Sequence, residues 1–296
     1  MAIIWHKVFN LHGSGALARS LCRLLDVENG TFECSAFPDG ETYLRIREDV
    51  DGLNIVILAD LCRPDRRTLP LLLLAETLRD LGARRVVLAA PYLPYMRQDK
   101  RFNQGEGITS RYFARLLSHY FDGLVTVDPH LHRYGDLSEI YSIPTRTGHA
   151  APLIADWIAA QVDRPILVGP DSESEQWVSA VARQADAPFT VLTKTRHGDR
   201  EVSVSMPIID RWPNHTPVLV DDIISSGHTM LETLSRLEAL GLPGAVCIGI
   251  HGIFAEGADT ALNKKAARLV TSNAIPHPSN AIDIAGPLAE SIEMIE

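Results

Sequence analysis

The stretch that decides the fold reads Val218-Leu-Val-Asp-Asp-Ile-Ile-Ser-Ser-Gly-His-Thr229. A short apolar strand ends at two carboxylates, and a turn rich in hydroxyl groups then opens a helix predicted over residues 229–240. The free N–H groups at the start of such a helix, together with Ser and Thr hydroxyls, are suited to bind a phosphate. The carboxylates would repel a bare phosphate, but they can accept hydrogen bonds from neutral hydroxyls. The stretch therefore predicts a sugar phosphate site; the alternative is a capped helix beside two solvated acids.

Apolar strands and amphipathic helices alternate along the rest of the chain, which predicts parallel sheets covered on both faces and an α/β fold class. Ligands bind at the carboxyl ends of strands in such sheets, which favours a functional role for Asp221 and Asp222. Gly82 and Gly241 follow two predicted helices, where a left-handed C-terminal cap is common. We predict strands at 55–59, 86–89, 124–127, 166–168, 190–192, 218–220 and 246–250, and helices at 16–25, 70–81, 109–120, 150–161, 174–186 and 229–240.

Length predicts two domains, because 296 residues are about twice a typical domain. A boundary near residues 142–146 divides the chain into nearly equal halves, 1–146 and 147–296, and each half has its own alternation of strands and helices. The two halves are therefore candidates for two copies of one architecture.

Charge and composition exclude several classes of protein. A net charge of −9 argues against nucleic acid as a main partner, because proteins that bind it normally carry a basic excess. The longest apolar run, Leu69–Ala75, is far shorter than the roughly 18 residues of a membrane helix, and the N-terminus shows no signal peptide. The four cysteines have neither disulfide nor zinc spacing. We expect a cytoplasmic protein that binds no membrane.

The stretch from Val218 resembles the phosphoribosyl pyrophosphate loop of the type I phosphoribosyltransferase superfamily. Further motifs follow in the order found in ribose-phosphate pyrophosphokinases, and the resemblance runs from about residue 10 to residue 276, with forms closer to the archaeal-type members. The motifs are Phe37-Pro-Asp-Gly-Glu41, Pro94-Tyr-Met-Arg-Gln-Asp-Lys-Arg-Phe102, Gly105-Glu106, Thr126-Val-Asp-Pro-His130, Gly169-Pro-Asp171 and Lys194-Thr-Arg196.

The resemblance implies two phosphoribosyltransferase-like domains, each a mainly parallel sheet flanked by helices. It implies an enzyme that transfers the β,γ-diphosphoryl group of ATP to the anomeric hydroxyl of ribose 5-phosphate and releases AMP. Such a transfer depends on positioning and on cations around the reacting phosphates. The family also forms homo-oligomers, so we expect a dimer or a multiple of dimers.

Site residues are carried over by the same resemblance. Arg97 and Gln98 would hold the ATP phosphates, and Phe37, Asp39 and Glu41 match the segment that recognises adenine in a neighbouring subunit. Lys194 and Arg196 would be catalytic, on a loop that closes over the reacting centre. His130 and Asp171 match positions associated with Mg²⁺. Asp221 and Asp222 would bind the ribose hydroxyls, and the 5-phosphate would be bound by Ser225, Ser226, Gly227, His228 and Thr229.

Two departures from the family pattern bear on these roles. Two extra acids, Glu173 and Glu175, follow Asp171, and we interpret them as part of the next helix's N-terminus, where acids are favourable. His228 stands where the family often has a glycine. We expect it in the first helical turn, because a positive φ would strain it.

Alternatives stay open at this point. The chain is either the diphosphokinase, a phosphoribosyltransferase that consumes phosphoribosyl pyrophosphate, or a non-catalytic regulatory relative of the synthetase. Taken singly, Arg97 and the pair Lys194 and Arg196 are better explained as solvated cations. A transition-metal site is an alternative for His130 with His132, but it is disfavoured because no third ligand lies at close spacing. The order of the motifs favours the first interpretation.

Overall fold

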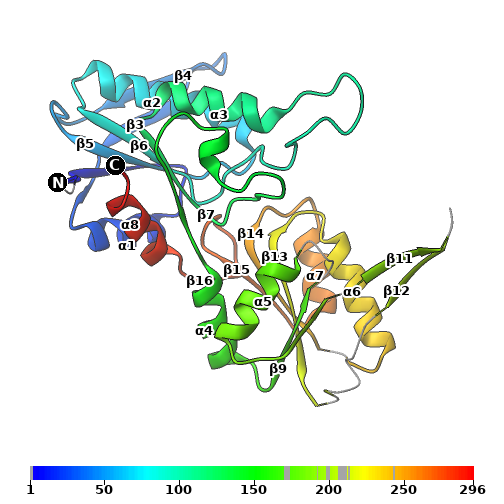
Figure 1. Ribbon diagram of the computed structural model, residues 1–296. Coiled ribbons are helices and arrows are strands. Elements are labelled where there is room, and N and C mark those ends of the chain that lie inside the picture. Colours follow the sequence, from blue (N-terminus) through cyan, green and yellow to red (C-terminus); the bar gives the residue numbers. More distant parts are fainter. Residues whose placement is uncertain are drawn as a thin grey trace. The chain divides into compact units, whose positions relative to one another are not determined.

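The computed structural model describes residues 3–169, 174–191, 193–197, 201–205, 212, 214–242 and 244–296 (Figure 1). Within it the chain forms two compact units, one of residues 1–149, 274–276 and 284–296, the other of residues 150–273 and 277–283. The C-terminal segment 284–296 thus belongs to the first unit, whereas the sequence analysis assigned residues 147–296 to the second domain. No helix in the described part of the chain is long and apolar enough to cross a membrane.

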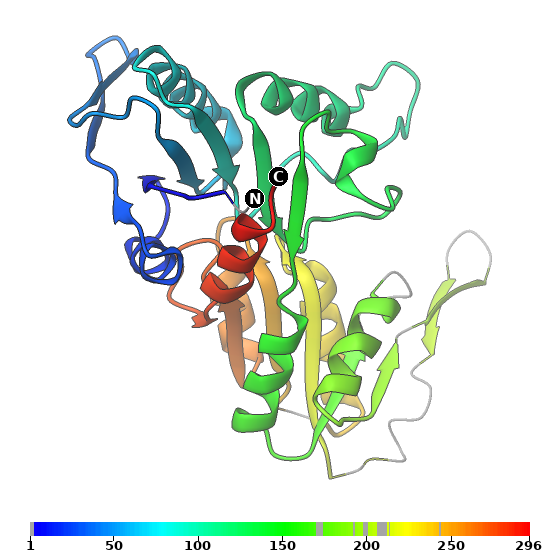
Figure 2. The same cartoon turned by 60° about the vertical axis from the view of Figure 1, so that its left-hand side comes forward.

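The first unit is built on a six-stranded parallel sheet in the order β2-β1-β5-β6-β7-β8. Its helices lie on both faces: α2 and α3 pack together on one, and α1 and α8 on the other (Figures 1 and 2). The strands are β1 (Lys7–Leu11), β2 (Glu28–Asn29), β5 (Asn54–Ala59), β6 (Arg85–Ala89), β7 (Gly123–Val127) and β8 (Thr145–Gly148), and the helices α1 (Gly15–Leu25), α2 (Thr68–Asp80), α3 (Thr109–Tyr120) and α8 (Ala285–Glu293). A separate antiparallel hairpin joins β3 (Phe32–Ala36) to β4 (Thr42–Ile46).

The core of the first unit explains why these segments form layers. Strands β5 and β6 are apolar and almost fully buried, and leucines of α2 such as Leu71 and Leu74 pack on them with no exposed surface. On the other face α8 lies so close to β8 that a Cβ on Gly148 would come within 2.9 Å of the Pro287 carbonyl oxygen. Arg146 Nε also donates to the Met294 carbonyl oxygen at 3.1 Å. These contacts hold the C-terminal helix on the first sheet.

The second unit repeats this plan with a parallel sheet in the order β10-β9-β13-β14-β15-β16. Counted along the chain, the strand order in both sheets is second, first, third, fourth, fifth, sixth, and in both an antiparallel hairpin separates the second strand from the third. The strands are β9 (Pro165–Gly169), β10 (Phe189–Val191), β13 (Thr216–Ile224), β14 (Val246–Gly252), β15 (Arg268–Ser272) and β16 (Asn280–Ile282), with helices α4 (Ala151–Gln161), α5 (Glu175–Gln184), α6 (His228–Ala239) and α7 (Ala258–Lys265) and the hairpin of β11 (Thr193–His197) and β12 (Glu201–Ser205). The two halves are therefore two copies of one architecture, and the predicted α/β fold is confirmed.

Most predicted elements are present with shifted ends. The two predicted caps are also confirmed, because Gly82 and Gly241 have φ values of 92° and 76°. The largest difference is β13, which was predicted over 218–220 but runs from Thr216 to Ile224. Its extra residues pair with β14, with Ile223 opposite His251 and Ile224 opposite Gly252. The apolar pattern of the segment itself does not show that it pairs with β14, so the sequence underestimated the length of the strand.

Candidate functional site

A short turn joins β13 to α6 in the second unit. Gly227 is the N-cap of α6 and has a φ of 69°, so it adopts the left-handed conformation that glycine tolerates best. Its lack of a side chain means that no cap side chain satisfies the first N–H groups of the helix, which leaves them to other acceptors. His228 is the first helical residue, is exposed, and donates its N–H to Ser226 Oγ at 3.4 Å. The expectation that His228 avoids a positive φ is confirmed.

The two carboxylates stand in the last part of β13, with Ile223 and Ile224 between them and this turn. Asp221 pairs in register with Gly249 of β14, and its Oδ1 accepts the Asp222 N–H at 3.0 Å. Both side chains are half-buried. The strand-turn-helix segment therefore brings together seven of the predicted residues: Asp221, Asp222, Ser225, Ser226, Gly227, His228 and Thr229. Acceptors beside helix N–H donors suit a ligand that carries both hydroxyls and a phosphate.

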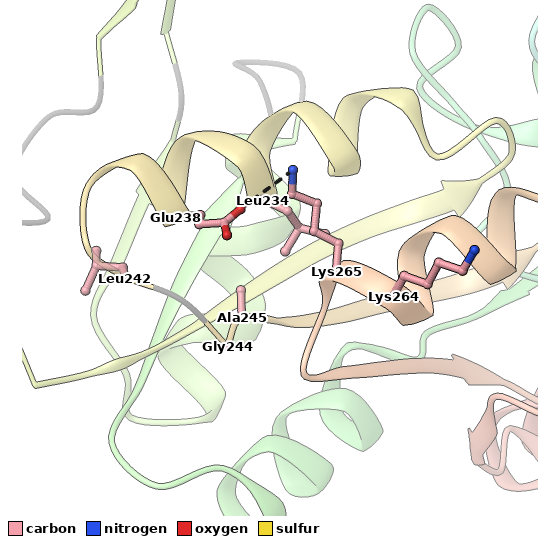
Figure 3. Close-up of a pocket in the computed structure, with 7 residues that line it drawn as sticks. All are labelled: Leu234, Glu238, Leu242, Gly244, Ala245, Lys264 and Lys265. Carbon is pink, nitrogen blue, oxygen red and sulfur yellow. Dashed lines mark ion pairs between the residues drawn. The ribbon is translucent and has the colours of Figure 1, made fainter.

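A hollow of about 120 Å³ lies at the opposite end of α6 (Figure 3). Lys265 points toward Glu238 across it, with 3.8 Å between Nζ and Oε2, and also donates to Ser235 Oγ. It is lined by Leu234, Glu238, Leu242, Gly244, Ala245, Lys264 and Lys265. None of these residues was predicted to bind a ligand, and the hollow is separated from the Ser225–Thr229 turn by the length of the helix.

In the first unit, Arg97 and Gln98 lie in the segment that leaves the carboxyl end of β6. Gln98 is fixed at two points, because its Oε1 accepts from Thr109 Oγ1 at 3.1 Å and its backbone oxygen accepts from Ser110 N–H at 3.3 Å. The side-chain oxygen of Gln98 therefore already accepts a hydrogen bond, and the N–H₂ group is the part that can donate to an anion. Arg97 is exposed. This pairing of a held amide and an accessible guanidinium fits a phosphate ligand.

His130 lies beyond the carboxyl end of the neighbouring strand, β7. Its half-buried ring stacks on that of His132, with centroids 3.7 Å apart and planes 30° from parallel. Asp128, in the same turn, has a φ of 36° and places Oδ1 2.9 Å from Nδ1 of His149. This hydrogen bond raises the pKa of His149 against the opposing effect of burial. The turn after β7 therefore carries a carboxylate bonded to His149 and an imidazole stacked on His132.

The β3–β4 hairpin carries Phe37, Asp39 and Glu41 at its tip. The turn is closed by Phe37 N–H to Glu41 O at 2.8 Å and by Glu41 N–H to Asp39 Oδ1 at 3.1 Å. The Phe37 side chain is 50% exposed and meets Tyr43 edge-on, with centroids 5.8 Å apart. An exposed aromatic ring at a hairpin tip is available to a ligand or to another subunit.

Three predicted site residues, Lys194, Arg196 and Asp171, are described only in part or not at all. Lys194 and Arg196 lie on β11, where they pair in register with Val204 and Val202 of β12. Asp171 and Glu173 lie outside the described residues. Glu175 opens α5 and stands in its first turn, as the sequence predicted.

Comparison with known proteins decides the family. Residues 6–120 match the model of the N-terminal domain of ribose phosphate pyrophosphokinase, and residues 136–285 match the phosphoribosyl transferase domain. A ribose-phosphate pyrophosphokinase of Methanopyrus kandleri is 30% identical over 280 residues, covering 94% of this chain and 95% of that one. That of Pyrococcus furiosus is 32% identical over 254 residues, covering 85% and 88%. The chain belongs to the ribose-phosphate pyrophosphokinase family.

The fold comparison agrees with this membership. The crystal structure of phosphoribosylpyrophosphate synthetase from Mycobacterium smegmatis matches with a TM-score of 0.84 at 24% identity and covers 97% of both chains. The resemblance drawn from the motifs, including its archaeal leaning, is thus confirmed. The roles of individual residues in this ribose-phosphate pyrophosphokinase relative stay predictions.

Sequence reasoning assigned no role to one ion pair of this site. Asp99, directly after Gln98, is buried and binds Arg133, which lies three residues after His130. The one sign of this pair in the sequence is an acidic residue among the cations of residues 97–101. Its partner, Arg133, lies 34 residues away along the chain.

Proposed function

We propose that this chain is a ribose-phosphate pyrophosphokinase, which transfers the β,γ-diphosphoryl group of ATP to the anomeric hydroxyl of ribose 5-phosphate and releases AMP. The observation that carries the proposal is that the N-terminus of α6, where Gly227 supplies no capping side chain, follows Asp221 and Asp222 through Ile224 and a short turn, in a chain that belongs to this family. That combination of donors and acceptors suits a phosphorylated pentose.

The second unit would bind ribose 5-phosphate. The first N–H groups of α6 and the hydroxyls of Ser225, Ser226 and Thr229 would donate to the 5-phosphate, and the helix dipole adds to this attraction. Exposed His228 adds a further donor. The Asp221 and Asp222 carboxylates would accept hydrogen bonds from the ribose hydroxyls. Both ends of the sugar are then fixed, which is the positioning that transfer to one hydroxyl requires.

The first unit would bind ATP. Arg97 and the N–H₂ group of Gln98 would hold its phosphates, and Phe37, Asp39 and Glu41 would recognise adenine from a neighbouring subunit. Lys194 and Arg196, on β11 of the β11–β12 hairpin, would be the catalytic residues. Their cations would stabilise the charge that develops on the phosphoryl oxygens and on the leaving AMP.

Mg²⁺ is the expected cofactor, held by His130 and Asp171. An imidazole and one carboxylate suit Mg²⁺ only where other oxygen ligands complete its shell, because this ion prefers oxygen and is commonly shared with substrate phosphates and water. The half-buried His130 ring is compatible with such a shared site. The ion supplies charge neutralisation on the diphosphoryl group when bound.

Two further features belong to the proposal. The exposed ring of Phe37 favours a homo-oligomer, a dimer or a multiple of dimers, in which the hairpin completes a neighbour's adenine site. We also propose a cytoplasmic location, where ATP and sugar phosphates are at hand for biosynthesis.

The experiment is product analysis with the purified chain alone. Incubation with Mg²⁺, ATP and ribose 5-phosphate should release AMP, and omission of ribose 5-phosphate should stop the release. ADP as the nucleotide product would contradict the proposal. Release of pyrophosphate from phosphoribosyl pyrophosphate and a base would identify a phosphoribosyltransferase instead. No turnover by the isolated chain would identify a regulatory relative.

A further inference from the structure

A buried carboxylate in the first unit has no part in the chemistry above. The side chain of Asp99 is 3% exposed, and Nη1 of Arg133 lies 2.7 Å from its Oδ1 and 3.0 Å from its Oδ2. Burying a charged carboxylate without a partner costs free energy. The ion pair with Arg133 therefore offsets the cost of burying Asp99. One nitrogen serves both oxygens.

This pair joins two segments that carry different predicted roles. Asp99 follows Arg97 and Gln98 after β6, and Arg133 follows His130 after β7. Because β6 and β7 are neighbouring parallel strands, the segments leave the same edge of the sheet. The pair is a direct side-chain link between the predicted phosphate-binding residues and His130.

Neighbouring contacts fix the link from both sides. Tyr134 Oη donates to the Asp99 carbonyl oxygen at 3.2 Å and lies 3.1 Å from Ser110 Oγ, in buried surroundings. The Arg133 guanidinium lies 5.6 Å from the centre of the Phe102 ring, which Lys100 Nζ approaches to 5.1 Å. The guanidinium therefore has contacts on two sides, the Asp99 carboxylate and the Phe102 ring.

We propose that Asp99 and Arg133 are positioning residues, which set the spacing between Arg97, Gln98 and His130 for diphosphoryl transfer. The inference rests on the proposed function. The pair acts through these three residues: it fixes where the phosphate donors stand relative to the imidazole that shares the metal. Loss of the link should therefore affect the transition state more than the binding of ribose 5-phosphate, which belongs to the second unit.

The test is a double-mutant cycle with Asp99→Asn, Arg133→Met and both together. Each of the three variants should lower kcat between about tenfold and 10²-fold, because a displacement of about 1 Å in a positioned group has this effect. The losses should agree within about twofold, since residues that act as one unit are not additive. The KM for ribose 5-phosphate should stay within about twofold of the original.

Thermal unfolding shows whether the ion pair positions the site residues or only stabilises the fold. Arg133→Met leaves the buried Asp99 carboxylate without its partner and lowers Tm, whereas the double variant removes both charges and should unfold within about 3 °C of the original chain. A double variant that regains both Tm and kcat would overturn the proposal, because the pair would then serve stability alone.

Two controls complete the design. Arg133→Lys should retain more of kcat than Arg133→Met, because a single nitrogen contacts both oxygens and an ammonium can take its place, and a loss equal to that of Arg133→Met would contradict the bridging geometry. Arg115→Met removes another arginine of this unit that approaches an aromatic ring, Tyr112 at 5.8 Å, and should leave kcat unchanged.

Failure of the proposed function is recognised separately. If the original chain releases no AMP, the enzymatic proposal fails, but hydrogen exchange still tests the link. Asp99→Asn should speed amide exchange at residues 130–134, and unchanged exchange there would show that the pair does not hold the second segment.

Discussion

Gly227→Ala offers the sharpest test of the phosphate turn, because its cost can be worked from the structure. With φ at 69°, an alanine there costs about 1–2 kcal/mol from the left-handed conformation alone. Its Cβ would also stand 3.0 Å from Cδ1 and 3.3 Å from Cγ of Leu262, a side chain with no exposed surface. Displacing a packed leucine adds about 1–3 kcal/mol.

Gly241→Ala is the matched control. Its φ of 76° gives the same backbone strain, but nothing lies within 4 Å of the added Cβ, and it follows the other end of α6. Urea unfolding should show a loss of about 2–5 kcal/mol for Gly227→Ala and of about 1–2 kcal/mol for Gly241→Ala. Equal losses would refute the claim that the turn is packed against Leu262.

The same two variants test function. Gly227→Ala should move the first N–H groups of α6 away from the phosphate. A loss of about 1.4 kcal/mol in the free energy of phosphate binding raises the KM for ribose 5-phosphate about tenfold, and this is the increase we expect. Gly241→Ala should leave that KM unchanged, and neither variant should alter the KM for ATP by more than about twofold. An unchanged KM for ribose 5-phosphate in Gly227→Ala would refute the phosphate-binding role of the turn.

Four further predictions follow. Lys194→Ala should lower kcat roughly 10²–10³-fold, as for loss of a single transition-state donor, and an effect on KM alone would contradict that role. Asp222→Asn should raise the KM for ribose 5-phosphate more than the KM for ATP, and equal weakening in steady-state assays would indicate a general electrostatic effect. Phe37→Ala should raise the KM for ATP and leave Tm within about 1 °C, because the ring is half-exposed; an unaltered KM would remove the ring from adenine binding. Hydrogen bonds from the Asn103 side chain and from the N–H groups of Asn103 and Phe102 hold the pKa of Glu106 below its ordinary 4.5, so this carboxylate stabilises its loop above pH 4.5 and ceases to do so as pH falls through its lowered pKa. Amide exchange at residues 102 and 103 should be slower than in Glu106→Gln above pH 4.5 and equal to it in strong acid, and a difference that persists in strong acid would contradict this.

Local apolarity was enough for the central strands and most helices, but not for elements that depend on distant partners. The predicted helix at 109–120 coincides with α3, and β5, β6 and β7 differ from prediction by one residue at an end. Strand β8 has the sequence Thr-Arg-Thr-Gly and is a strand because it pairs with β7. The last helix joins the first unit through contacts such as Gly148 with Pro287, which no local pattern encodes.

The site shows the same division. The Val218–Thr229 stretch carries its own turn, cap and carboxylates within twelve consecutive residues, so its local geometry followed from the sequence. The link between Asp99 and Arg133 did not, because it forms only when β6 and β7 become neighbours. The resemblance to a family supplied roles, such as those of Lys194 and Asp171, that no residue pattern alone would assign.

The most direct test of the central claim is ³¹P NMR of the complete reaction, followed in time. The account predicts that the β- and γ-phosphoryl signals of ATP give way together to a pair of coupled diphosphate signals on the sugar, while AMP appears in equal amount. Appearance of ADP with a new monophosphate ester, or of free pyrophosphate with no sugar diphosphate, would contradict it.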